Sequence, residues 1–147
     1  MRSEPSARQP YSLPQWLSSP AGEYLLAWEQ SHCDRVLSDV FGYHALQVGL
    51  APLHALRGNR MPKQWLAADV WPELSASGHV SLYTDPVALP FAAASLDLIV
   101  LPHTLDWCSD PHAALREVER VLVPEGRVLI FSFNPRSEEH TSELQSH

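Results

Sequence analysis

The hydrophobic positions of this 147-residue chain change their spacing several times, and the first regular stretch predicts a helix. From residue 20 to about residue 40, large apolar side chains recur every three to four positions. Ser19 suits the N-cap, Pro20 suits the first helical position, and Gly42 suits the end of the segment. The face that we expect to be buried carries Leu25, Trp28, Cys33, Val36, Leu37 and Val40.

Shorter apolar runs farther along the chain predict strands, because each is bounded by glycine, proline or polar residues. The clearest runs are residues 45–50, 80–83, 96–101 and 127–133. Residues 64–70 fit either a strand or a helix, and residues 53–57 predict one or two helical turns.

The strongest helical signal begins at Asp110 and Pro111, an N-cap followed by a proline at the first helical position. A turn is expected at residues 124–126, before the last apolar run. A strand, a helix and a strand joined by short links form a right-handed βαβ unit. The predicted fold class is therefore α/β, with a doubly wound, mostly parallel sheet. The apolar face of this helix carries Ala114, Leu115, Val118, Val121 and Leu122.

Charge and composition narrow the classes of partner and compartment. The chain has 17 acidic and 10 basic residues, a net charge of −7, which argues against nucleic acid and against an anionic membrane surface. Two cysteines, Cys33 and Cys108, are too few for a disulfide framework, and the residues after Met1 lack the apolar run of a signal peptide. We therefore expect a cytoplasmic protein.

The last twelve residues, 136–147, differ abruptly in composition, since Leu144 is their only large apolar side chain. Their sequence resembles the in-frame translation of a common sequencing adapter, and an ordinary polar tail is the alternative. The expected organisation is a leader and helix over residues 1–44, a partial core over 45–135 and a non-native tail over 136–147. Without a following native segment, the strand at residues 127–133 should lie at the sheet edge with unpaired backbone groups.

Ligands of open parallel sheets bind beyond the carboxyl ends of the strands. That rule selects residues 49–52, 69–71, 84–86 and 102–107. Gly49 alone is weak evidence for a nucleotide loop, because a tight turn after a strand needs a glycine equally well.

A series of motifs in the second half of the chain points to a family. Asp85 is followed by Leu-Pro-Phe at 89–91 and Ser-Leu-Asp at 95–97, and then by Glu117, Arg120-Val121-Leu122, Pro124 and Gly126. Their order and spacing over residues 81–133 resemble the class I S-adenosylmethionine-dependent methyltransferases of the type 11 group. The resemblance implies a Rossmann-like sheet, incomplete at its C-terminus and preceded by an N-terminal helical extension, with S-adenosylmethionine as the cofactor.

The resemblance also implies roles for individual residues. Asp85 matches the acid that binds the adenine amino group, and Asp69 fits the acid that binds the ribose hydroxyls, although a surface aspartate in a loop is the alternative for Asp69. The remaining predicted cofactor residues are Gly49, Leu101, Pro102 and Trp107; core packing is the alternative for Trp107. The sequence departs from the family's glycine-rich pattern at three positions, where Gln47 stands for an acid, Ala51 adds a Cβ and Pro52 lacks an N–H.

His103 follows the fourth predicted strand and is the candidate general base or substrate contact, with a place in the pocket wall as the alternative. We expect no metal site, since His103, Asp106, Cys108 and His112 match no familiar ligand spacing. The predicted function of the intact protein is methyl transfer from S-adenosylmethionine to an unidentified small-molecule acceptor. The alternative is a binding or regulatory module that keeps the fold without catalysis.

Overall fold

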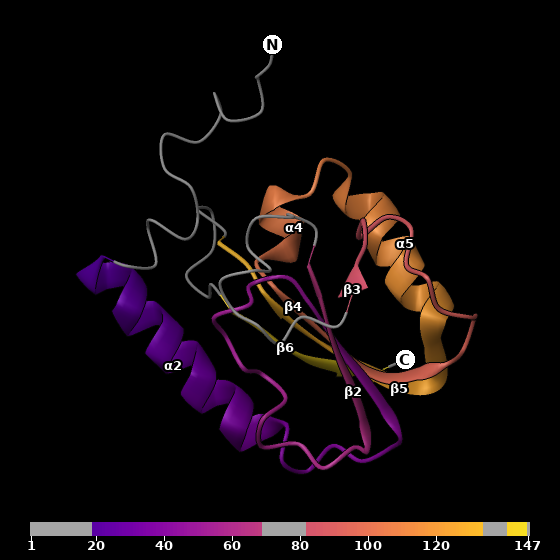
Figure 1. Cartoon of the computed structure of the whole chain (residues 1–147), viewed down its shortest axis with the longest axis horizontal. Helices are drawn as coiled ribbons and strands as arrows, with labels where there is room; N and C mark the ends of the chain where they lie inside the picture. The colour runs from indigo at the N-terminus through magenta and orange to yellow at the C-terminus, as the bar shows by residue number, and fades with distance from the viewer. Residues whose placement is uncertain (1–18, 69–81, 134–140, 147) are drawn as a thin grey trace.

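Six strands form a single sheet in this computed structural model, which describes residues 19–68, 82–133 and 141–146 (Figure 1). The strand order is β3-β2-β1-β4-β5-β6. Every pairing among β1 to β5 is parallel, whereas β6 runs antiparallel to β5. The predicted α/β class with a mostly parallel sheet is confirmed. The strands are β1 (His44–Val48), β2 (Lys63–Ala68), β3 (Leu82–Tyr83), β4 (Leu96–Pro102), β5 (Leu122–Phe131) and β6 (Thr141–Ser146).

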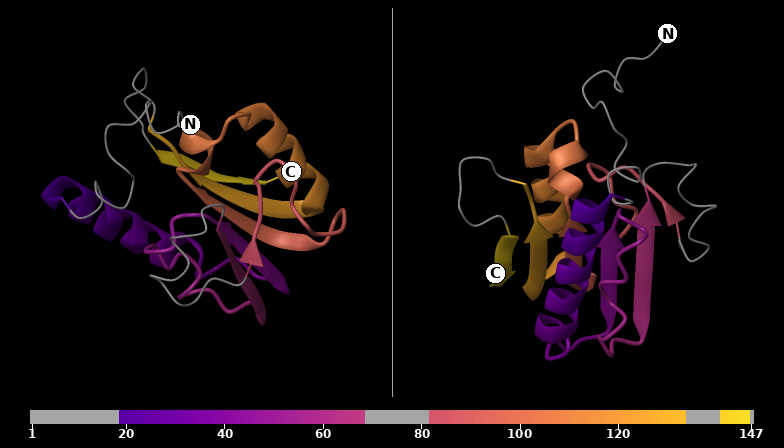
Figure 2. Two further views of the ribbon diagram at one scale, coloured as in Figure 1. Left: turned by 45° about the horizontal axis from the view of Figure 1, so that its top comes forward. Right: turned by 90° about the vertical axis from the view of Figure 1, so that its left-hand side faces the viewer.

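Helices α2 (Pro20–Val36) and α5 (Pro111–Val121) cover opposite faces of the sheet, and the short α4 (Thr104–Trp107) follows β4 (Figures 1 and 2). Alternate residues of the central strands point to the two faces. Leu98 and Val100 of β4 pack with Cys33 of α2, whereas Ile99 packs with Val118 of α5. The sheet therefore has an apolar core on each side.

Helix α5 agrees closely with its prediction. The Asp110 side chain accepts a hydrogen bond from the Ala113 N–H at 3.1 Å and caps the first turn. The expected inner face is buried except at Leu115, which is 38% exposed at the margin of the stripe. The buried members are Ala114, Val118, Val121 and Leu122.

Helix α2 begins as predicted, with the Ser19 hydroxyl accepting from the Gly22 N–H, but its end and its inner face differ from the prediction. It ends at Val36, about four residues early. Glu29, a charged residue, is 1% exposed, whereas Trp28 is 41% exposed. Cys33, Leu37 and Val40 of the predicted face are buried, and Leu25 and Val36 are half-buried. The prediction missed Glu29, because an apolar pattern does not mark a carboxylate that is buried with a partner.

Two connections also differ from their predictions. Residues 53–57 form turns rather than a helix, with backbone bonds from Leu53 N–H to Leu50 O and from Arg57 N–H to His54 O. Residues 124–126, where a turn is expected, lie within the bounds of β5, at an irregularity in its pairing with β4. Residues 64–68 of the ambiguous segment 64–70 belong to β2, and residues 69 and 70 lie outside the described residues.

The expectation of an unpaired β5 edge is wrong, since β6 hydrogen-bonds along it (Figure 2). An open strand edge presents donors and acceptors that any extended segment can satisfy, whatever its side chains. Residues assigned to a non-native tail thus supply the sixth strand. Within the described ranges, none of the helices combines the length and the apolar run that crossing a bilayer requires.

Candidate functional site

The chain leaves β1 in an unusual backbone conformation. Gly49 has φ +88° and the next residue, Leu50, has φ +54°, a left-handed value that side chains other than glycine rarely adopt. The Gly49 N–H donates to Ala67 O of β2 at 2.6 Å, which closes the end of the strand pair. The turn lies at the carboxyl edge of the parallel sheet, the position that the sequence predicted for a ligand.

The Gln47 side chain fixes this turn through hydrogen bonds to its backbone. The sequence analysis did not predict this role. Its side chain is buried, and its Nε2 lies 2.9 Å from Gly49 O, 3.0 Å from Leu50 O and 2.8 Å from Leu53 O. Its Oε1 accepts from the Ala55 N–H at 3.0 Å. One amide therefore contacts four main-chain groups of a single loop, in place of the acid that the resemblance predicts.

Two polar side chains of helix α2 also hydrogen-bond the connection that follows β1. The Gln30 amide donates to His54 O at 2.8 Å and accepts from the His54 N–H at 2.9 Å. Asp34 takes two hydrogen bonds from Arg57, at 3.1 and 2.6 Å, which lower the pKa of its carboxyl. These contacts are largely exposed, so we assign them a part in orientation more than in stability.

The segment after β4 is joined to the end of β1. The Thr104 hydroxyl donates to Val48 O at 2.6 Å. A Cβ added at Gly49 would lie 3.8 Å from Thr104 Oγ1, an ordinary contact, so the glycine is required by its φ and not by crowding. The hydroxyl thus connects two of the predicted ligand-binding segments.

His103, the predicted general base, is buried between two carboxylates. Its Nε2 lies 2.6 Å from Glu29 Oε2 of α2, and its Nδ1 lies 3.0 Å from Asp106 Oδ2. Burial alone would lower the pKa of His103, but the hydrogen bonds to Asp106 and Glu29 outweigh it and raise the pKa to about 9. An imidazole protonated at neutral pH has no lone pair to accept a proton, so this geometry favours an ion pair over a base.

The ion pairs extend into a network that joins three elements. Asp106 also accepts hydrogen bonds from the Ser132 hydroxyl at 3.2 Å and the Phe133 N–H at 3.0 Å, just past β5. The His103 ring stacks on Phe133 with centroids 4.2 Å apart. The network of Glu29, His103 and Asp106 therefore fastens α2 to the carboxyl ends of β4 and β5.

The other predicted site residues take different positions. Asp85 lies exposed just past β3, and its Oδ1 accepts from the Val87 N–H at 3.1 Å. Leu101 and Pro102 are buried at the end of β4, where Leu101 joins the core on the α5 face. Within the described part of the chain the buried indole N–H of Trp107 has no acceptor. Asp69 lies outside the described residues.

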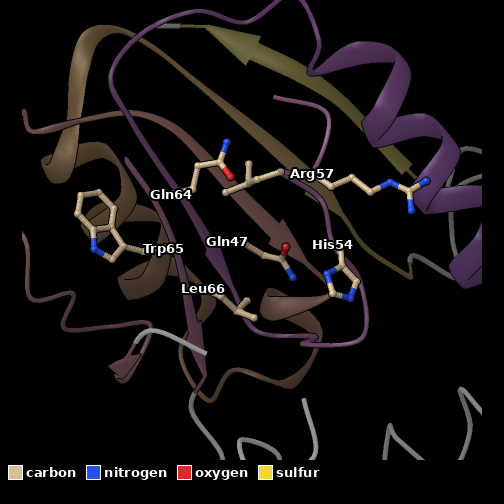
Figure 3. A pocket seen from close by; sticks show the side chains of 7 residues that line it. Gln47, His54, Arg57, Gln64, Trp65 and Leu66 are labelled. Carbon is tan, nitrogen blue, oxygen red and sulfur yellow. The ribbon is translucent and has the colours of Figure 1, made fainter. Parts of the chain in front are cut away.

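A cavity of about 170 Å³ lies beside β1 and β2, lined by residues of both strands and of the 49–62 connection. Figure 3 shows Gln47 and His54 on one side of the strands and Trp65 on the other. Gly49, Asp85, Leu101, Pro102 and Trp107, the predicted cofactor residues that the structure describes, do not line this cavity. Among the described residues, no three His, Cys, Asp or Glu side chains are grouped to hold a metal ion.

Comparisons with known proteins agree with this architecture. Residues 48–130 match a family model described as a methyltransferase domain. YafS of Escherichia coli, an uncharacterized protein, is 32% identical over 132 residues, which cover 83% of this chain and 49% of that protein. A malonyl-(acyl-carrier protein) O-methyltransferase of Methylovorus is 43% identical over 47 residues, or 32% of this chain and 16% of that protein.

Solved structures show the same fold. The YcgJ protein from Bacillus subtilis superimposes with a TM-score of 0.64 at 19% identity, covering 73% of this chain and 51% of that one. The chain thus spans about half the length of the first curated relative and of this structural neighbour.

Proposed function

The chain belongs to the methyltransferase domain family that its residues 48–130 match, and on that premise we propose that it forms the cofactor-binding part of an S-adenosylmethionine-dependent methyltransferase. The methyl group would pass to a small-molecule acceptor in the intact protein. The observation that supports this most is the left-handed turn at Gly49 and Leu50, placed where β1 ends in a parallel sheet.

The residues at the strand ends fit such a cofactor. Asp85 offers an exposed carboxylate past β3, which suits the exocyclic amine of an adenine. The Trp107 indole N–H is a buried donor that lacks an acceptor among the described residues, and a bound polar molecule would satisfy it. Gly49 contributes a bare backbone beside the Thr104 hydroxyl.

The protein's own groups would mainly bind and orient the reactants. The cofactor supplies a sulfonium whose carbon–sulfur bond breaks as the acceptor's lone pair bonds to the methyl carbon, leaving that electron pair on sulfur. Positioning can supply much of the rate in such a displacement. We propose that His103 acts as a cation that anchors Glu29 and Asp106, and that any deprotonation of the acceptor uses another group.

Calorimetric titration of the 147-residue chain with S-adenosylhomocysteine, the product form of the cofactor, tests the proposal. We expect saturable binding, weakened about tenfold or more in Asp85→Ala because a charge-assisted hydrogen bond is lost. Asp39→Ala is the matched control, since Asp39 is an exposed aspartate between α2 and β1, away from the carboxyl strand ends. Absence of binding, or equal weakening in both variants, would favour a fold retained without the cofactor.

A further inference from the structure

The loop over residues 49–55 keeps its shape without the repeated glycines that the family pattern contains. Only Gly49 is a glycine, and Leu50 adopts φ +54° although leucine is disfavoured there. Ala51, which adds a Cβ to the family's glycine-rich pattern, and Leu53 are both buried. Something other than freedom of the backbone must therefore select this conformation.

The contacts of Gln47 identify what selects it. Three carbonyl oxygens of the loop converge on a single nitrogen, Gln47 Nε2, at 2.8 to 3.0 Å, and one loop N–H reaches Gln47 Oε1 at 3.0 Å. Every one of these partners is a main-chain group. The side chain therefore stabilises this backbone conformation whatever the side chains of the loop are. Because Gln47 is only 3% exposed, little water competes for these hydrogen bonds.

The chemistry of the amide is essential to this arrangement. An amide both donates and accepts, whereas an ionised carboxylate only accepts. A glutamate at position 47 would place negative charge against the carbonyls of Gly49, Leu50 and Leu53. An ionised acid at position 47 therefore disfavours this loop conformation, although glutamate differs from glutamine by one heavy atom.

We propose that Gln47 is the positioning residue of the cofactor loop, and that its amide replaces the missing glycines in setting the main chain that meets the cofactor. The inference rests on the proposed function for its effect on the cofactor, and on the loop geometry alone for its effect on the backbone. It predicts that restoring the family's acid at position 47 weakens binding.

The test compares Gln47→Glu, Gln47→Met and the unchanged chain. The matched control is Gln64→Glu on the neighbouring strand, where Gln64 Nε2 donates to one carbonyl, Asn59 O, and the residue is exposed. Binding of S-adenosylhomocysteine is measured by calorimetry from pH 5 to 8, below each variant's melting temperature. We expect Gln47→Glu and Gln47→Met to bind at least tenfold more weakly at pH 8, and Gln64→Glu to bind within twofold of the unchanged chain.

The pH profile separates positioning from loss of stability. Burial raises the pKa of a carboxyl, so at pH 5 the new glutamate at position 47 would be neutral and could donate to one carbonyl. Relative to the unchanged chain, Gln47→Glu should regain affinity as the pH falls, whereas Gln47→Met should not. Affinity in both variants equal to that of the unchanged chain, with only a lower melting temperature, would overturn the proposal.

A second readout needs no cofactor. Hydrogen exchange at the Ala55 amide, which donates to Gln47 Oε1, should accelerate at least tenfold in Gln47→Met and stay unchanged in Gln64→Glu. If the unchanged chain binds no S-adenosylhomocysteine but this exchange result holds, the proposed function fails and the loop-positioning role stands. If exchange is equal in all variants, the loop-positioning role fails whatever binds.

Discussion

The two long helices begin alike and dock differently. Ser19 and Asp110 both cap a first turn that contains a proline, and both helices cover one face of the same sheet. Helix α5 docks through the apolar side chains Ala114, Val118 and Val121. Both helices add polar contacts. Glu117 and Arg120 of α5 hydrogen-bond the main chain of Leu89 at partly buried positions, whereas Glu29 of α2 forms a fully buried pair with His103.

This difference explains why the sequence did not identify Glu29 as part of the buried face of α2. A stripe of apolar residues along a helix predicts which face is buried, because the burial of apolar side chains is favourable. A buried carboxylate looks like a surface residue in the sequence, because its burial depends on a cation that lies 74 residues away. The helix with the weaker apolar pattern is the one that reaches the proposed site.

Removing the Glu29 carboxylate should cause the largest loss of stability among these predictions. Glu29→Leu leaves His103 with only one of its two ion-pair partners, so we expect the free energy of unfolding to fall by about 3–5 kcal/mol in urea titrations. Glu23→Leu, an exposed glutamate in the first turn of the same helix, is the control and should cost under about 1 kcal/mol. Equal effects would show that the buried pair contributes nothing special.

The pH dependence of stability should depend on the same Glu29–His103 ion pair. The pKa of His103 lies near 9 in the folded chain, against an ordinary value of 6.5, so folding favours its protonated form. Its contribution is fully present below pH 6.5 and is lost as the pH rises through about 9, a decrease of roughly 3 kcal/mol.

His103→Gln is the control for that scan. It keeps the other titrating groups, including the Cys33 thiol, whose pKa burial raises to about 12. Urea unfolding at pH 6, 7.5 and 9 should show a steeper decline in the unchanged chain than in His103→Gln. Parallel curves for the two proteins would refute the assignment of a protonated His103.

A smaller loss of stability is expected from a substitution in the apolar core between α5 and the sheet. Val118→Ala removes two methyl groups from the core between α5 and the sheet, which should cost about 2 kcal/mol at every pH. Leu115→Ala, at the exposed margin of the same helix, should cost well under half as much. The comparison would be weakened if Val118→Ala showed the pH dependence that we assign to the α2 side.

The candidate site, like the two helices, has features that the sequence predicts and features that it does not. The sequence located the strand-end segments, because strand ends follow from apolar runs and parallel strands share one carboxyl edge. It did not predict that Gln47 would brace the first loop, since those four partners are main-chain groups that no sequence pattern marks. The roles predicted for Gly49, Asp85, Leu101, Pro102 and Trp107 remain predictions.

What the sequence determined by itself was local: the capped start of each long helix, the apolar strands and the α/β class. These features depend on side chains within a few positions of one another, so spacing reveals them. The tertiary structure alone decided the burial of Glu29, the ionisation of His103 and the pairing of β5 with β6. Each of these depends on a partner distant in the chain, and the free energy of a buried charge or an open edge is set by what folding brings beside it.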